Sequence, residues 1–128
     1  KESDIILLRL ADILLLKAEA LVELNRPKEA LMIVNDIRNR AGLSGLSLSL
    51  SVAEARLAVE NERQLELLFE GQRWWDLIRN ERMEEVMKLV HDKNGNLRFS
   101  EIPAWRAKLP IPQAQIDINE RLTQNIGY

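Results

Sequence analysis

The sequence has no cysteine, a single histidine and only six aromatic residues among its 128 positions. Without cysteine it can form no disulfide, and it can supply no thiolate metal ligand, thiol nucleophile or lipid-modified cysteine of its own. The single histidine, His91, leaves a di-metal site short of ligands and gives nucleophilic catalysis no base paired with a nucleophile. We therefore expect no catalytic residue, no bound metal and no cofactor.

Neither sign of charge dominates, because 18 Lys and Arg residues stand against 20 Asp and Glu residues, a formal net charge of −2. The two signs are interspersed and form no basic stripe, which makes nucleic acid a poor candidate partner. Apolar residues make up 46% of the chain and charged residues 30%, proportions that are ordinary for a folded protein. At this length the chain fits a single domain, residues 1–128.

An uninterrupted apolar run is also missing. Residues 5–24 have the length of a membrane span, but five charged residues interrupt them: Arg9, Asp12, Lys17, Glu19 and Glu23. Each charge would cost about 2–3 kcal/mol at the centre of a bilayer. The segment therefore predicts a buried helix of a soluble protein, and we expect this segment of chain to carry no membrane anchor.

Two helices are predicted in the first third of the chain. The first helix carries apolar residues at spacings of three and four: Ile6, Leu10, Ile13, Leu14, Ala18, Leu21 and Leu24. Four more leucines widen this surface beyond one stripe: Leu7, Leu8, Leu15 and Leu16. Pro27 is suited to the first position of a second helix, which we expect to end at Gly42.

This helix pair, residues 3–42, resembles a single tetratricopeptide repeat, with Asn25 where the turn usually has glycine. A lone repeat cannot bury its own faces, and about three are needed for stability. The pair therefore favours a chain that is the C-terminal part of a longer protein. The fragment would otherwise associate with itself through the first helix. An alternative remains open, in which the two later helices of this chain cover the same surface.

The remaining two thirds predict two further helices and an extended tail. Residues 43–50 form a linker rich in leucine and serine, after which Ser51 and Glu54 make a capping box for a third helix. This helix should reach Glu70 with its inner face formed by four residues: Ala58, Leu65, Leu68 and Phe69. A break at Gly71 and a fourth helix from Arg73 to His91 should follow.

The tail should begin with a tight turn at Asn94-Gly95, the tip of a small hairpin. Two prolines and two alternating apolar pairs, Leu109/Ile111 and Ile116/Ile118, favour an extended strap. The whole is therefore predicted as all-α: a helix pair (3–42), a linker (43–50), helices over 51–91, and a turn and strap (92–128).

Two adjacent tryptophans make the stretch LFEGQRWWDLIR, residues 68–79, the natural place to look for a site. Successive helical residues lie 100° apart, so Trp74 aligns with the core stripe of Leu77 and Ile78 while Trp75 lies beside it. Its charged residues fall at helical spacings of three and four, where they can satisfy one another. We interpret the stretch as buried core with an ion network, whose signature residues are Arg63, Glu66, Glu70, Gly71, Arg73, Trp74 and Asp76.

Ligand contacts are harder to place from the sequence. The paired carboxylates Glu66 and Glu70 suggest acid–base or metal chemistry, but no histidine lies near them. Trp105, in the polar segment EIPAWRAK, is the best candidate for an exposed aromatic that contacts a ligand. Packing of the strap against a helix is the competing role for its ring.

Three blocks of the chain resemble, in order and spacing, the C-terminal region of the SusD/RagB family. They are RLADILLLKAEALVELNRPKEAL, ENERQLELLFEGQRWWDLIR and LPIPQAQIDINERLTQNIGY. Gln64 stands where the family more often has a second arginine, and Ile126 stands where it often has proline.

The resemblance implies a largely helical, non-enzymatic protein built on tetratricopeptide-like helix pairs. It implies a surface-exposed outer-membrane lipoprotein that captures oligosaccharides or peptides and works with a SusC-like TonB-dependent transporter. The family's sugar-contacting aromatics lie mainly upstream of these blocks, so no binding residue carries over to a position here. The alternative function is a stand-alone tetratricopeptide-like module that binds a peptide or a partner helix.

Overall fold

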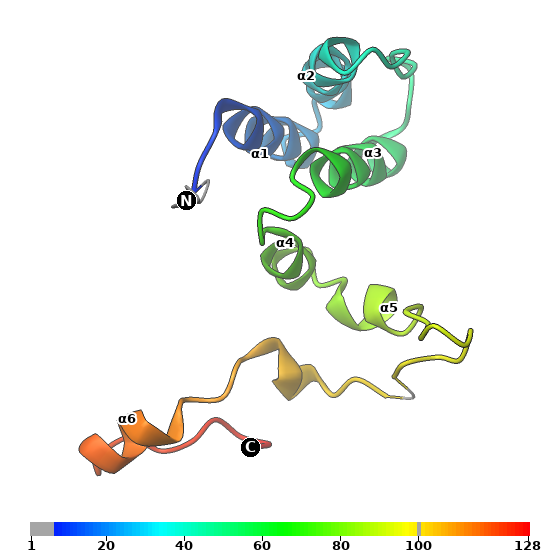
Figure 1. The fold of residues 1–128 in the computed structure, drawn as a ribbon. Helices are drawn as coiled ribbons and strands as arrows, with labels where there is room; N and C mark the ends of the chain where they lie inside the picture. Colours follow the sequence, from blue (N-terminus) through cyan, green and yellow to red (C-terminus); the bar gives the residue numbers. More distant parts are fainter. Residues whose placement is uncertain (1–6, 100) are drawn as a thin grey trace, which may run out of the picture. The chain divides into compact units, whose positions relative to one another are not determined.

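The computed structural model describes residues 7–99 and 101–128, and the fold over these ranges is all-α, as predicted (Figure 1). The elements are α1 (Leu10–Glu23), α2 (Pro27–Arg40), α3 (Val52–Glu66), α4 (Arg73–Arg79), α5 (Met83–Met87), a 3₁₀ turn η1 (Ala104–Ala107) and α6 (Gln113–Ile118). The chain divides into two compact units, one ending at Asp76 and the other running from Leu77 to Tyr128. Among the described residues, no helix is long and apolar enough to cross a membrane.

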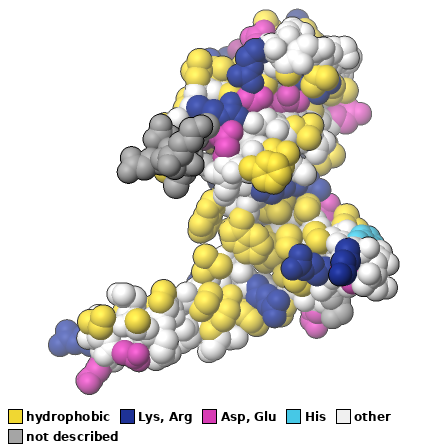
Figure 2. Space-filling model, in the orientation of Figure 1, with side chains coloured by type: hydrophobic (Ala, Val, Ile, Leu, Met, Phe, Trp, Pro, Cys, Tyr) yellow, Lys and Arg dark blue, Asp and Glu magenta, His cyan; other side chains and the backbone are white. Residues whose placement is uncertain are grey.

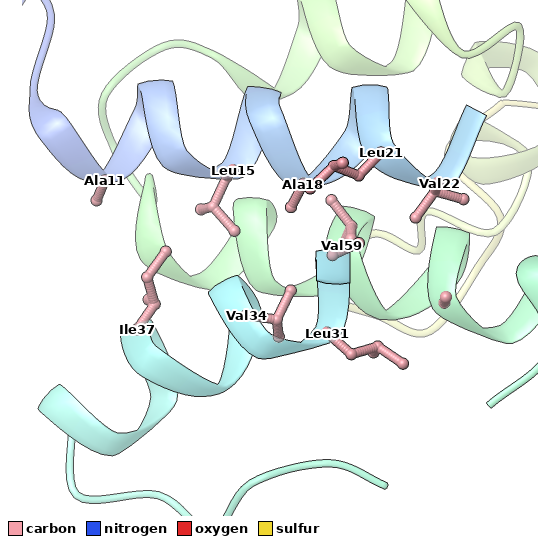
Figure 3. Packing of buried hydrophobic residues seen from close by; sticks show 11 residues of the cluster. Ala11, Leu15, Ala18, Leu21, Val22, Leu31, Val34, Ile37 and Val59 are labelled. Carbon is pink, nitrogen blue, oxygen red and sulfur yellow. The ribbon is translucent and has the colours of Figure 1, made fainter. Parts of the chain in front are cut away.

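The core of the first unit lies where α1, α2 and α3 meet, each helix packing against the other two. Figure 3 shows apolar side chains from the three helices directed toward one another. Leu15, Leu31 and Val34 are fully buried there. Ala18 and Ala30 are also fully buried. Their small side chains let the backbones of α1 and α2 approach closely, as in a tetratricopeptide pair. The helix pair of the sequence analysis is therefore present as α1 and α2.

The buried face of α1 differs from the predicted stripe. Leu10 and Leu24, which belong to that stripe, are 73% and 67% exposed, whereas Leu15, placed outside it, is completely buried. A helix with leucine on several faces offers several possible stripes, and the neighbouring helices decide which one is buried. Positions 3–6 of the predicted pair lie outside the described residues, and α1 begins at Leu10.

An apolar face of α1 nevertheless remains uncovered, as the sequence led us to expect. Its exposed members, together with the two leucines that precede the helix, are Leu7, Leu8, Leu10, Ile13, Leu16 and Leu24. Helix α3 packs on α1 but leaves this face open. Within the first unit, α3 therefore covers only part of the apolar surface of α1.

The ends of α2 and α3 follow the capping signals of the sequence. Asn25 has a φ of 59° in the turn before α2, Pro27 is its first residue, and Gly42 has a φ of 77° after its end. The Ser51 hydroxyl accepts the Glu54 backbone N–H while the Glu54 carboxylate accepts the Ser51 backbone N–H, which completes the predicted capping box.

The linker between α2 and α3 is fixed by the side-chain amide of Asn35. Its Nδ2 donates to the backbone carbonyl of Leu46 at 2.9 Å, and its Oδ1 accepts the Leu46 backbone N–H at 2.6 Å. A Cβ atom at Gly45 would lie only 3.1 Å from the Asn35 side chain. The serine-rich linker is therefore pinned to α2 near its middle.

The third and fourth predicted helices are both shorter than the sequence suggested. Helix α3 ends at Glu66, and the residues expected on its inner face near the end are exposed: Leu65 by 63%, Leu68 by 55% and Phe69 by 96%. The predicted helix from Arg73 to His91 is broken into α4 and α5, because Glu81 adopts a positive φ of 56° between them. Such a conformation cannot continue a right-handed helix.

The second unit contains two further departures from the prediction. Residues 113–118 form helix α6, where alternating apolar pairs indicated an extended strap. The two prolines lie just before this helix, and Pro112 takes the N-cap position, so they precede the helix rather than exclude it. The expected hairpin at Asn94-Gly95 is reduced to a single antiparallel bridge between His91 and Leu97.

Candidate functional site

Two of the signature residues, Arg63 of α3 and Asp76 of α4, meet in a buried ion cluster. Arg63 is 3% exposed, and its guanidinium donates two hydrogen bonds of 3.0 Å to the two carboxylate oxygens of Asp76. Its Nη1 atom donates to Asp12 Oδ1 at 2.9 Å and to the Asp12 backbone carbonyl at 3.2 Å. One guanidinium therefore joins α1, α3 and α4, with both aspartates also buried.

A second ion pair lies beside this cluster. Arg73 Nη1 donates to Glu60 Oε1 at 3.0 Å, and the Glu60 side chain is 6% exposed. The charges of this stretch were expected to pair at spacings of three and four, but the carboxylate that Arg73 binds belongs to α3, thirteen positions earlier in the chain. Arg63 and Arg73 are therefore both paired with carboxylates of the first unit.

A third network holds the end of α3. Arg9 Nε donates to both carboxylate oxygens of Glu70 at 2.9 Å, and Arg9 also donates to the side chain and backbone carbonyl of Glu66. Arg40 donates to the same Glu66 carboxylate. Figure 2 shows basic and acidic side chains side by side on the visible surface of this unit. The network binds the start of α1 and the end of α2 to α3.

The pKa values of this network follow from its geometry. Burial would raise the pKa of Glu66, but hydrogen bonds from Arg9 and Arg40 outweigh it and hold this pKa below its ordinary value. Hydrogen bonds to Glu70 and Glu66 raise the pKa of Arg9 above its ordinary value. A Glu66 carboxylate whose pKa is lowered in this way stays ionised, which suits a structural network better than acid–base catalysis.

The lowered pKa of Glu66 predicts a specific pH dependence of stability. Its stabilising contribution is complete above the ordinary carboxyl pKa of 4.5 and is lost as the pH falls through the lowered value. Glu66→Gln should therefore reduce the free energy of unfolding by about 1 kcal/mol at pH 7, the upper range for a partly exposed ion pair. Urea unfolding of both proteins at pH 7 and pH 3 measures this. Equal losses at the two pH values would contradict the prediction.

The turn after α3 carries the other signature residues. Gly71 has a φ of +79°, as expected for a break between helices, and Phe69 also has a positive φ, of 67°. Trp74 is half-buried, whereas Trp75 is 57% exposed. The Trp74 Nε1 atom is enclosed and has no hydrogen-bond partner among the described residues.

Trp105, the sequence-based candidate for ligand contact, lies in η1 against the C-terminus. Its ring meets the Tyr128 ring edge-to-face with centroids 4.8 Å apart, and the Arg106 guanidinium lies 5.3 Å from its centroid. The Tyr128 hydroxyl donates to the backbone carbonyl of Lys108, and the Gln124 amide pairs with both the N–H and the carbonyl of Ile111. We refer to this fastening of residues 124–128 onto residues 105–111 as the C-terminal latch.

Gly127 lies where the latch packs against the Trp105 ring. It has a φ of +100°, and a Cβ atom there would lie 2.3 Å from the Trp105 ring. Gly127→Ala should therefore open the latch and raise the hydrogen-exchange rate of the Ile111 amide at least about tenfold, since Gln124 would no longer hold it. Gly95→Ala is the matched control, because Gly95 has a similar φ of +82° but open space around it. Equal exchange at Ile111 in the two variants would contradict the role of the contact.

Metal binding finds no support in the part of the chain that the structure describes, which has no group of three His, Asp or Glu residues arranged to hold an ion. His91 is exposed, and its Nδ1 atom lies 2.8 Å from the Leu89 backbone carbonyl. The gathered charges instead join helices to one another.

A family model described as the SusD family matches residues 1–128. The chain belongs to the SusD family. Among curated relatives, the SusD-like protein P38 of Formosa agariphila is 41% identical over 99% of this chain and 25% of its own length. The starch-binding protein SusD of Bacteroides thetaiotaomicron is 32% identical over 99% of this chain and 22% of its own length.

Solved structures show the same SusD-family fold. A SusD-like protein from Bacteroides fragilis superposes with a TM-score of 0.75 at 28% identity, over 97% of this chain and 26% of that one. The surface glycan-binding protein A from Bacteroides uniformis superposes with a TM-score of 0.72 at 33% identity, over 91% of this chain and 26% of that one. This SusD-family chain thus spans about a quarter of the length of the relatives it matches.

Several members of the ion networks were missed at the level of sequence. Asp12, Glu60 and Arg9 pair with residues 13 to 61 positions away, and helical spacing predicts only neighbours three or four positions apart. One signal was available for Asp12, because a charged residue among leucines of a buried helix needs a partner. Nothing local indicated that Arg63 would be that partner.

Proposed function

We propose that this chain is the C-terminal, non-catalytic scaffold portion of a longer SusD-like protein that captures glycans. The observation that carries the proposal is the family match over the whole chain, together with relatives about four times as long. Two of these relatives are named for binding carbohydrate: one is a starch-binding protein and the other a surface glycan-binding protein. The three-helix core and its ion networks would hold the binding region of the longer polypeptide in place.

The setting proposed for the longer polypeptide follows from the same membership. It is a surface-exposed lipoprotein of the outer membrane that passes oligosaccharides, or peptides in some branches, to a SusC-like TonB-dependent transporter. The ion pairs of the described residues are consistent with this setting. Their charged side chains join helices to one another rather than line a catalytic centre. Co-purification of a transporter with the longer polypeptide would test the partnership.

The scaffold role predicts where glycan binding is found. The 128-residue chain should show no micromolar affinity for maltoheptaose or for other oligosaccharides, because the arginines beside its exposed Phe69 ring, Arg63 and Arg73, are already paired with carboxylates and leave a sugar few polar groups to bind. The longer polypeptide should bind at least one of them. Calorimetric titration of both proteins with one panel of oligosaccharides measures the difference. Micromolar binding by the 128-residue chain would overturn the scaffold assignment.

A second candidate is a stand-alone tetratricopeptide-like module that binds a partner helix. The uncovered leucine face of α1 favours it, since such a face can accept the apolar side of an amphipathic helix. The gene upstream of this chain separates the two candidates. A lipoprotein signal and several hundred further residues support the SusD-like scaffold, whereas an independent start near residue 1 supports the module.

A further inference from the structure

The turn that the His91–Leu97 bridge closes carries a residue pair that the proposed function does not use. Asn94 and Gly95 lie at its tip, and both are exposed. The chain contains nine asparagines, and only Asn94 is followed by glycine. At each of the others the next residue has a side chain that crowds the peptide nitrogen after the asparagine.

Hydrogen bonds of the turn hold the backbone of this pair. The Asp92 carboxylate accepts the backbone N–H groups of Asn94 at 2.8 Å and Asn96 at 3.0 Å, and the Gly95 N–H donates to the Asp92 carbonyl at 3.1 Å. The side-chain amide of Asn94 makes no hydrogen bond within the part of the chain that the structure describes. The fixed backbone therefore carries a side chain that can turn toward the Gly95 nitrogen.

Gly95 leaves that approach open. It has a φ of +82°, and no atom lies within 4 Å of the place that a Cβ atom would take. Glycine is the residue that lets other groups come closest to its backbone. The carbonyl carbon of the Asn94 amide, Cγ, can therefore reach the Gly95 nitrogen without displacing a neighbour.

We propose that Asn94 is a modification site, at which the chain converts its own asparagine to aspartate and isoaspartate without an enzyme. The Gly95 nitrogen attacks Asn94 Cγ, so that a bond forms between them and the Cγ–Nδ2 bond breaks. The side-chain nitrogen leaves as ammonia and takes the hydrogen that the Gly95 nitrogen gives up. Water then opens the succinimide ring at either of its two carbonyl groups. One opening gives aspartate, and the other gives isoaspartate.

The isoaspartate product changes the turn itself. Its main chain is longer by one methylene group, and its carboxylate stands two positions from that of Asp92. The groups on either side of the tip, which now meet in the hydrogen bonds from Asp92 N to Asn96 O and from Arg98 N to Val90 O, both 2.8 Å, would be moved out of register. The conversion should therefore open the turn.

Peptide mass spectrometry of the 128-residue chain after incubation at pH 8 tests the proposal, with an isoaspartyl methyltransferase to detect isoaspartate. Asn94 should convert at least about tenfold faster than Asn96, which is exposed in the same turn but precedes Leu97. Both isoaspartate and aspartate should form at Asn94. Equal rates at the two asparagines overturn the proposal. Aspartate without isoaspartate also overturns it, because direct hydrolysis of the side chain would then be the route.

Gly95→Ala supplies the matched variant and should slow conversion of Asn94 at least about tenfold, since its methyl group hinders the attack. A positive φ is unfavourable for alanine, so the variant can also alter the turn. Both proteins are therefore incubated in urea as well, where the turn is absent and the methyl group remains. The slower conversion of the variant should persist there. Equal rates for the two proteins in urea would overturn attack by the Gly95 nitrogen.

Discussion

Replacing Arg63 with methionine should destabilise the protein by about 3–5 kcal/mol, the usual cost of removing one partner from a buried ion cluster. The reason is that Asp12 and Asp76 are 6% and 4% exposed, and the Arg63 guanidinium donates hydrogen bonds to both carboxylates. Methionine fills a similar volume, so the loss reflects uncompensated charge more than a cavity. Urea unfolding monitored by circular dichroism measures the change.

Two further variants make the Arg63→Met result interpretable. Arg56→Met removes an arginine that pairs with Glu23 at the surface, where the side chains are 45% and 56% exposed, and it should cost at most about 1 kcal/mol. Adding Asp12→Asn and Asp76→Asn to Arg63→Met removes both buried charges and should recover part of the loss. A loss below about 1 kcal/mol for Arg63→Met alone would show that the cluster contributes little.

Leu15→Ala should cost about 2–5 kcal/mol, because Leu15 is completely buried between the three helices of the first unit. Leu10→Ala, about one and a half turns earlier on the same helix, should change stability by less than about 1 kcal/mol, since Leu10 is 73% exposed. Unfolding of the two variants under the same conditions compares the two faces of α1. Equal losses, or a larger loss for Leu10→Ala, would mean that the predicted stripe is the buried one.

The two faces of α1 also show which features of the fold can be predicted from the sequence alone. Helix α2 was predictable because Pro27 and Gly42 mark its ends, and the start of α3 was predictable because Ser51 and Glu54 form a capping box. These signals act between neighbours in the chain. The buried face of α1 was not predictable, because leucines surround the helix and the choice among them belongs to α2 and α3.

The same distinction between signals from chain neighbours and effects of distant residues explains the incorrect predictions for the second half of the chain. The break at Glu81 requires a positive φ at an ordinary residue, for which no glycine or proline gives warning. Helix α6 is only six residues long, and its apolar residues fit an extended pattern as well as a helical one. The candidate site was found in part: Arg63, Arg73 and Asp76 were singled out, but their partners Asp12 and Glu60 lie too far away in the chain for local spacing to indicate them.

The Asn35 amide that holds Leu46 has a consequence for how this protein can change in length. By satisfying both backbone groups of Leu46 it divides the linker into two spans with different tolerance. Residues added between Ala41 and Gly45 would shift the register of the linker against α2, so the paired groups would no longer meet. Residues added at Ser47 to Ser49, which are exposed, would only lengthen a loop, at a cost that grows slowly with its size. Insertions and grafted sequences should therefore be accepted on one side of Leu46 and rejected on the other.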